Sequence, residues 1–106
     1  LHGELGAGKT TFVRGFLRAL GHTGTVKSPT YTLIESYPLP SKICHHLDLY
    51  RLNDPYELDN LGLRDLLDDQ SIFLIEWPEM ATDCLPGADV GIHIAYHEKG
   101  RLLSIS

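Results

Sequence analysis

Cysteine, long apolar runs and positive charge are all scarce in this sequence of 106 residues. The two cysteines, Cys44 and Cys84, are too few for a disulfide scaffold and lack metal-ligand spacing, so we expect a reduced, cytoplasmic protein. No run of about 18 or more apolar residues is present, which argues against a membrane-spanning helix. Nine lysines and arginines against fourteen aspartates and glutamates give a net charge of -5, which argues against a protein that coats nucleic acid or an anionic membrane.

Repeats, low-complexity tracts and long linkers are absent as well, and the length suits one domain rather than two. An apolar content of 42% and a charged content of 22% are ordinary for a globular fold. We therefore expect a single domain over residues 1–106. Because a phosphate-loop pattern begins at the third residue, and such loops follow a buried strand, we expect this domain to be a fragment without its N-terminal strand.

Apolar spacing and turn residues predict an α/β fold of the phosphate-loop NTPase type, with a mixed sheet and flanking helices. The apolar run 72–75 is typical of a strand buried on both faces. Gly21 stands where the first helix should stop, and Gly62 is where the second would break. The expected elements are helices over 9–20 and 54–67, strands over 30–37, 42–50 and 71–76, and a closing hairpin over 90–105.

The strongest motif lies at the start of the chain. Residues 3–10, Gly-Glu-Leu-Gly-Ala-Gly-Lys-Thr, match the phosphate-loop pattern G-x-x-x-x-G-K-[ST] at every specified position. Glycines let backbone N–H groups converge on phosphate oxygens, and the positive end of the helix that starts near Lys9 adds to the field. Lys9 would reach the outer phosphates, and the Thr10 hydroxyl would bind Mg²⁺. The alternative is a glycine-rich turn before an ordinary helix, but a helix begins where the mechanism requires one.

Hydrolysis also requires acidic groups, and two candidates lie on predicted strands. Glu76 ends the strand 71–76, where a carboxylate would project beside the phosphate loop and serve the metal; the alternative is an acid at a strand end that faces water. Asp48 shares one strand face with His46 and Tyr50, and this face is either a solvated edge or one wall of a site. Periodicity alone does not decide whether this strand face is exposed to solvent or forms part of a site.

Cys44 and the histidines other than His46 are not predicted to take part in the chemistry. Cys44 lies on the same strand face as Asp48 and is expected to pack rather than to react. His45 lies on the opposite face and is expected to be structural or exposed. The remaining histidines show no ligand spacing, and they stand at positions 2, 22, 93 and 97.

Taken together, four segments resemble the TsaE (YjeE) family in their order and spacing. They are the phosphate loop continued through Thr11-Phe12, then Ser28-Pro29-Thr30-Tyr31, then His46-x-Asp48-x-Tyr50-Arg51-Leu52, and then Ile75-Glu76-Trp77-Pro78-Glu79. The loop alone is generic, whereas the His-x-Asp-x-Tyr-Arg and Glu-Trp-Pro-Glu motifs are specific to the family. The resemblance runs from Leu1 to about Arg101. The family consists of small bacterial ATPases required to form threonylcarbamoyladenosine in tRNA.

The resemblance implies roles that the residues alone do not assign. Asp48 would activate or orient the attacking water, Glu76 and Thr10 would serve the Mg²⁺, and Lys9 would complete the catalytic set. The segment 28–30 would form a switch-like loop near the γ-phosphate. Tyr50, Arg51 and Trp77 would shape the site or a partner surface. The residues implied to hold ATP are Gly3, Gly6, Ala7, Gly8, Lys9, Thr10, Thr11 and Arg101.

The resemblance also implies partners. The family works with the TsaD and TsaB proteins, and its ATPase is thought to reset their complex between turnovers. The tRNA would be reached only through that complex, and no membrane is involved.

Two other functions stay open on the sequence. A small-molecule phosphotransferase uses the same loop, although such enzymes usually close an arginine-bearing lid over the phosphates and no insertion here is long enough for one. A nucleotide-dependent binding switch that does not hydrolyse ATP would need the loop but not the acids.

Overall fold

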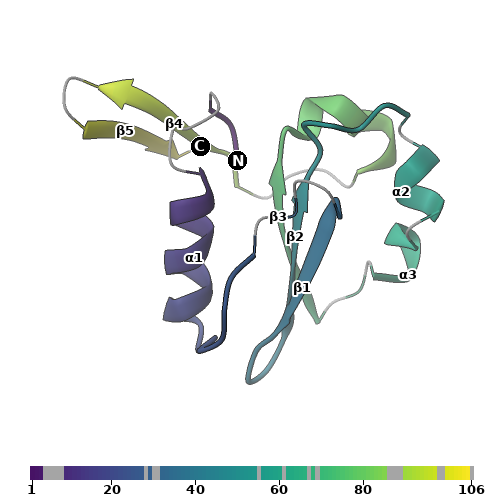
Figure 1. Ribbon diagram of the computed structural model, residues 1–106, viewed down its shortest axis with the longest axis horizontal. Coiled ribbons are helices and arrows are strands. Elements are labelled where there is room, and N and C mark those ends of the chain that lie inside the picture. Colours follow the sequence, from purple (N-terminus) through teal and green to yellow (C-terminus); the bar gives the residue numbers. More distant parts are fainter. Residues whose placement is uncertain are drawn as a thin grey trace.

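The computed structural model describes residues 1–3, 9–27, 29, 32–54, 56–60, 62–66, 68, 70–85, 90–97 and 100–105, and for residues 59, 64, 82–84, 96, 97 and 101 it describes the backbone alone. Figure 1 shows the arrangement of its helices and strands. The elements are α1 (Lys9–Ala19), β1 (Ile34–Pro38), β2 (Ile43–Asp48), α2 (Tyr56–Asn60), α3 (Leu63–Leu66), β3 (Ser71–Glu76), the 3₁₀ helix η1 (Pro78–Cys84), β4 (Ile92–His97) and β5 (Gly100–Ile105). No helix within these ranges is long and apolar enough to cross a membrane.

The three strands β1, β2 and β3 form one sheet in that order. β1 runs antiparallel to β2, whereas β2 and β3 are parallel, so the predicted mixed sheet is confirmed. Strands β4 and β5 form a separate antiparallel pair, which confirms the closing hairpin. In the parallel pair Asp48 stands opposite Glu76, so both carboxylates lie at the carboxyl end of their strands.

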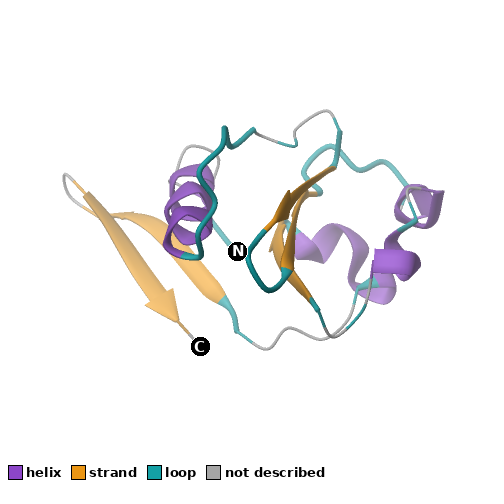
Figure 2. Ribbon diagram, turned by 90° about the horizontal axis from the view of Figure 1, so that it is seen from below, coloured by secondary structure: helices purple, strands orange, loops and turns teal. Residues whose placement is uncertain are grey.

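Helices cover both faces of the three-stranded sheet. Figures 1 and 2 show α1 on one side and the short helices α2 and α3 on the other. The core toward α1 joins Val13 and Leu17 to Tyr37 and Cys44. The core on the opposite face consists of Leu47, Leu49, Leu52, Leu58, Leu63 and Ala81. The alternation along β2 produces this division, because successive side chains of a strand point to opposite faces.

The helix boundaries follow the capping signals of the sequence. Gly21 has φ 104°, and two hydrogen bonds close the end of α1: Gly21 N donates to Arg18 O at 3.1 Å, and His22 N donates to Leu17 O at 3.0 Å. These are the two bonds of a Schellman motif. Asp54 accepts from Tyr56 N at its Oδ1 at 3.0 Å just before α2, and Gly62 at φ 80° separates α2 from α3. The predicted helix stop and helix break are confirmed.

Two strand predictions need correction. The strand expected over 30–37 begins only at Ile34, because Leu33 has φ 68° and its N donates to Pro29 O at 2.8 Å, which makes a turn. The prediction that β3 is buried on both faces is wrong. Its side chains from Ser71 to Ile75 are only partly buried, because within the described residues β3 pairs with β2 alone and has one open edge.

Candidate functional site

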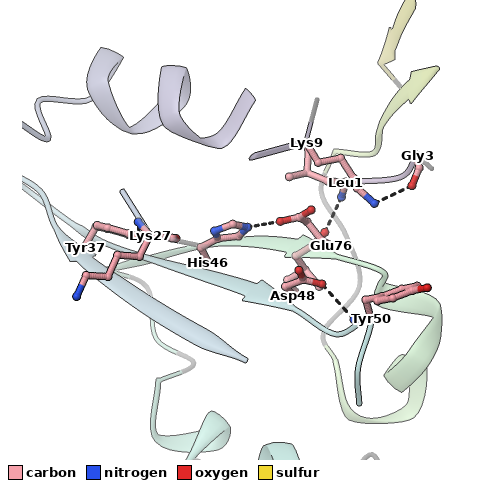
Figure 3. A network of polar contacts seen from close by, with 10 residues as sticks. Leu1, Gly3, Lys9, Lys27, Tyr37, His46, Asp48, Tyr50 and Glu76 are labelled. Carbon is pink, nitrogen blue, oxygen red and sulfur yellow. Dashed lines mark hydrogen bonds and ion pairs between the residues drawn. The ribbon is translucent and has the colours of Figure 1, made fainter. Parts of the chain in front are cut away.

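Lys9, Asp48 and Glu76 come together from three elements: the start of α1 and the ends of β2 and β3 (Figure 3). Lys9 is only 5% exposed, and a lysine is rarely buried without partners. Its Nζ donates to Gly3 O at 2.7 Å and lies 4.1 Å from the centroid of the Trp77 ring. The ammonium therefore lies beside Gly3, the first residue of the loop that the sequence predicts to bind phosphate.

Burial and the neighbouring charges shift the pKa of Lys9 in opposite directions. Burial lowers the pKa of Lys9, while the nearby carboxylates of Glu76, Asp48 and Glu79 raise it. The same acids are thus within electrostatic reach of the ammonium. The buried ammonium is therefore partly balanced by carboxylates from β2, β3 and the residues that follow β3.

Asp48 is a partly buried carboxyl with a perturbed affinity for protons. Burial raises its pKa, the hydrogen bond from Tyr50 N to Oδ1 at 3.1 Å lowers it, and the charge of Glu76 raises it further. His46 and Lys9 act in the lowering direction. A carboxylate in this setting can accept a hydrogen bond or a proton from water close to Lys9.

Glu76 is almost fully buried, with 4% of its surface exposed. His46 Nε2 lies 2.5 Å from Glu76 Oε2, and His46 is 0% exposed. We assign Nε2 as the donor of this hydrogen bond, because a carboxylate oxygen accepts. His46 Nδ1 is buried and has no hydrogen-bond partner within the described part of the chain. Strand periodicity predicts that His46 shares a strand face with Asp48, but it does not predict the hydrogen bond to Glu76.

One aromatic ring borders the lysine, and a second ring packs against the first. Trp77 follows β3 in the left-handed conformation, with φ 57° and ψ 50°, and its ring lies 5.0 Å from that of Tyr50. The turn at Trp77 carries the indole back over Lys9, while Tyr50 is 45% exposed. The Trp77 ring therefore lies against the ammonium, and the Tyr50 ring lies beside Trp77.

Comparison with known proteins identifies the family. The chain matches the family model described as threonylcarbamoyl adenosine biosynthesis protein TsaE over residues 1–103. The chain belongs to the TsaE family. It is 50% identical over 105 residues to the tRNA threonylcarbamoyladenosine biosynthesis protein TsaE of Haemophilus influenzae, covering 99% of this chain and 66% of that protein. It is 43% identical over 86 residues to the protein of the same name from Bacillus subtilis, covering 81% of this chain and 53% of that protein.

A solved structure has a similar fold. The crystal structure of Bacillus subtilis YdiB matches with a TM-score of 0.75 and 33% identity, covering 98% of this chain and 62% of that one. The chain thus spans about half to two thirds of the length of these three proteins.

The residues that lead into the TsaE phosphate-loop motif lie beside the end of β3. Leu1 N donates to Ile75 O at 2.6 Å, and His2 forms a parallel bridge with His93 of β4. Gly3 then presents its carbonyl to Lys9. Gly6, Ala7 and Gly8 lie outside the described residues, so their contact with phosphate stays a prediction.

Other residues predicted from the TsaE resemblance lie around this centre or outside the described part. Thr10 is partly buried and Thr11 is exposed, both in the first turn of α1. Arg101 lies in β5 opposite Tyr96, but its side chain is outside the description. In the expected switch-like loop Pro29 is fully buried, while residues 28 and 30 lie outside the described residues. Their roles stay predictions.

The donor atoms present suit Mg²⁺ held together with a nucleotide. Within the described residues no group of three or more His, Cys, Asp and Glu side chains could hold a metal ion. Mg²⁺ at nucleotide sites takes one or two protein oxygens and completes its shell with phosphate oxygens and water. The Glu76 carboxylate and the Thr10 hydroxyl, both hard oxygen donors, fit that requirement.

Proposed function

We propose that this protein is a Mg²⁺-dependent ATPase that serves as an accessory subunit in forming threonylcarbamoyladenosine in tRNAs that read codons beginning with A. The observation that supports the ATPase is the meeting of Lys9 with Asp48 and Glu76, which are register partners at the ends of parallel strands. Ligands of open α/β sheets bind at this carboxyl edge. Membership of the TsaE family supports the role in tRNA modification.

Each group at the site has a separate part in this proposal. Lys9 leaves the Gly3 carbonyl and holds the outer phosphates as a point charge. Glu76 and the Thr10 hydroxyl hold Mg²⁺, which when bound neutralises charge on the phosphates. Asp48 orients the attacking water and accepts a hydrogen bond from it, with its own orientation fixed by Tyr50 N. The Trp77 ring shields the ammonium from water on one side.

The accessory role follows from the charge and the family. A net charge of -5 is unsuited to holding tRNA directly, because nucleic-acid affinity is dominated by cationic contacts with phosphate. We infer that the protein reaches tRNA through a complex with TsaD and TsaB in the cytoplasm, and that its ATP cycle resets this complex between turnovers.

The deciding experiment measures ATP turnover by the complete natural protein with and without the TsaD–TsaB pair. We expect the pair to change the rate. Phosphate release should not depend on added small acceptor molecules. A rate unaffected by the pair would remove the accessory role, and strong acceptor-dependent ADP formation would show a phosphotransferase instead.

Variants separate binding from chemistry. Lys9→Ala should abolish ATP binding, whereas Asp48→Ala and Glu76→Ala should bind ATP and fail to turn it over, a loss of at least about 100-fold. Glu57→Gln, on α2 at the opposite face of the sheet, is the control and should behave as wild type. Normal hydrolysis by both acid variants would contradict the roles assigned to Asp48 and Glu76.

A further inference from the structure

His46 is a buried imidazole whose polar contact goes to one carboxylate oxygen. Its Nε2 lies 2.5 Å from Glu76 Oε2, and the two side chains are 0% and 5% exposed. The other ring nitrogen, Nδ1, is buried and without a hydrogen-bond partner among the described residues. A buried polar atom without a partner destabilises the folded protein. An apolar side chain of similar size would avoid that cost, so the value of an imidazole here lies in its bond to Glu76.

The strand register shows how this bond is made. His46 stands opposite Leu74, and Glu76, two residues further along β3, stands opposite Asp48. His46 and Asp48 share a strand face, so the imidazole reaches diagonally across the parallel pair to the carboxylate (Figure 3). Oε2 is occupied by this bond, and the rotation of the carboxylate is fixed. Oε1 is then the oxygen left for a ligand.

We propose that His46 is the positioning residue for Glu76: its Nε2–H holds the buried carboxylate in the orientation that presents an oxygen to Mg²⁺ bound with the nucleotide. This inference rests on the proposed function, since it takes Glu76 as a ligand of the metal. Carboxylates that bind metals depend on such outer hydrogen bonds, and loss of the partner typically weakens metal affinity about 10- to 100-fold.

The adjacent histidine provides a matched control. His45 is also buried, at 4% exposure, but it faces away from the site. Its Nδ1 lies 2.7 Å from Ser36 Oγ, and its ring lies 5.1 Å from that of Phe73. A substitution at His45 therefore disturbs the same strand and a similar burial without touching Glu76.

Three variants of His46 test the bond itself. His46→Leu keeps the volume and removes the donor. The amide nitrogen of His46→Gln reaches about as far from the backbone as Nε2, whereas that of His46→Asn reaches only as far as Nδ1. The glutamine variant should therefore restore the bond and the asparagine variant should not. His45→Gln is measured alongside them.

The readout is binding, not turnover. The complete protein is titrated with the fluorescent analogue methylanthraniloyl-ATP, first in EDTA and then with increasing Mg²⁺, and thermal unfolding checks that each variant is folded. We expect the Mg²⁺ midpoint to rise about 10- to 100-fold in His46→Leu and His46→Asn, and only a few-fold in His46→Gln. Nucleotide affinity in EDTA and the His45→Gln midpoint should stay within about twofold of wild type.

The outcomes separate this inference from the proposed function. A wild-type Mg²⁺ midpoint in folded His46→Leu overturns the role of His46 while leaving the ATPase intact. If His46→Leu does not fold, equal midpoints in His46→Gln and His46→Asn overturn it as well. If Mg²⁺ does not change the binding of the analogue to wild-type protein, Glu76 is not a ligand of the metal, and the positioning role of His46 is overturned as well. If wild-type protein does not bind the analogue at all, the proposed function itself is wrong.

Discussion

The ammonium of Lys9 lies between the carbonyl oxygen of Gly3 and the face of the Trp77 ring, at 2.7 Å from the first and 4.1 Å from the ring centroid of the second. These two contacts stabilise the lysine where it is 5% exposed. Cation–π contacts of this kind contribute about 0.5–2 kcal/mol, depending on how far they are desolvated. Under the proposed function a phosphate group would compete with both partners, so nucleotide binding would alter the surroundings of the indole.

Nucleotide binding should therefore change the fluorescence of Trp77, the single tryptophan of this sequence. The emission shifts because Nζ leaves the ring face when it binds phosphate. In Lys9→Met, which keeps the aliphatic stem and lacks the ammonium, the emission of the free protein should already differ and ATP should cause no further change. Tryptophans elsewhere in the complete chain are replaced by phenylalanine for this measurement. Identical emission in the two free proteins, with no response to saturating ATP, would contradict the contact.

Asp48→Asn should stabilise the protein at neutral pH while removing turnover. Burial and the charge of Glu76 raise the pKa of Asp48 in the folded state, so the folded protein binds this proton more tightly than the unfolded chain. Stability is therefore lost as pH rises through the raised pKa, and it is fully present below the unfolded value near 3.8. Asparagine removes the buried charge and keeps an oxygen for Tyr50 N.

Urea unfolding without nucleotide and metal measures this effect. The difference between Asp48→Asn and wild type should be largest near pH 7 and should vanish as the pH falls below the unfolded pKa of 3.8. Asp54→Asn, at the exposed start of α2, is the control and should show no such pH-dependent gain. A variant less stable than wild type at pH 7 would show that the charge of Asp48 stabilises the fold.

The sequence predicts the local elements well because their signals are local. The stripe through Val13 and Leu17 places α1, and the alternation between Cys44 and Leu47 assigns the two faces of β2. Gly21 predicts the end of the first helix because glycine adopts positive φ without steric cost, and this property depends on the one residue alone. Glu76 could also be placed at a strand end, whereas the strand predicted around Asp48 runs to Tyr50, two residues beyond the observed end of β2.

The contacts within the site depend on information that the sequence does not contain locally. His46 and Glu76 are separated by 30 positions, and their bond depends on the register of two parallel strands. The sequence around Trp77 does not predict its left-handed backbone, because bulky residues rarely adopt that conformation. The contact between its ring and Lys9 is therefore not predicted either. The burial of β3 is overestimated from sequence because an apolar run shows that a strand can be buried on both faces, but not how many elements pack against it.

Cys44 should resist alkylation in the folded protein. Its side chain is fully buried against α1, and burial raises the pKa of the thiol to about 11. At pH 8 only about one thiol in a thousand is then ionised, and the thiolate is the reactive form. Iodoacetamide should label it only after unfolding, which mass spectrometry detects in a Cys84→Ser background. Rapid labelling under native conditions would mean that this core opens readily.

Two glycines near one another in sequence should respond to alanine in opposite directions. Gly15 lies in the exposed middle of α1, and an added Cβ would meet nothing within 4 Å. Gly15→Ala should therefore stabilise the protein by about 0.5–1 kcal/mol, because alanine loses less conformational freedom in a helix. Gly21 has φ 104°, and a Cβ there would lie 3.2 Å from two ring carbons of Pro40. Gly21→Ala should destabilise by at least about 1 kcal/mol through backbone strain.

Urea unfolding midpoints of the two variants, measured under the same conditions, decide the matter. The signs are expected to differ because one site needs only helix propensity and the other needs a left-handed backbone at the end of α1. Equal stabilisation by both substitutions would show that the turn after α1 accepts an ordinary residue. The hydrogen bonds from Gly21 N and His22 N to the last turn of the helix would then not require the observed geometry.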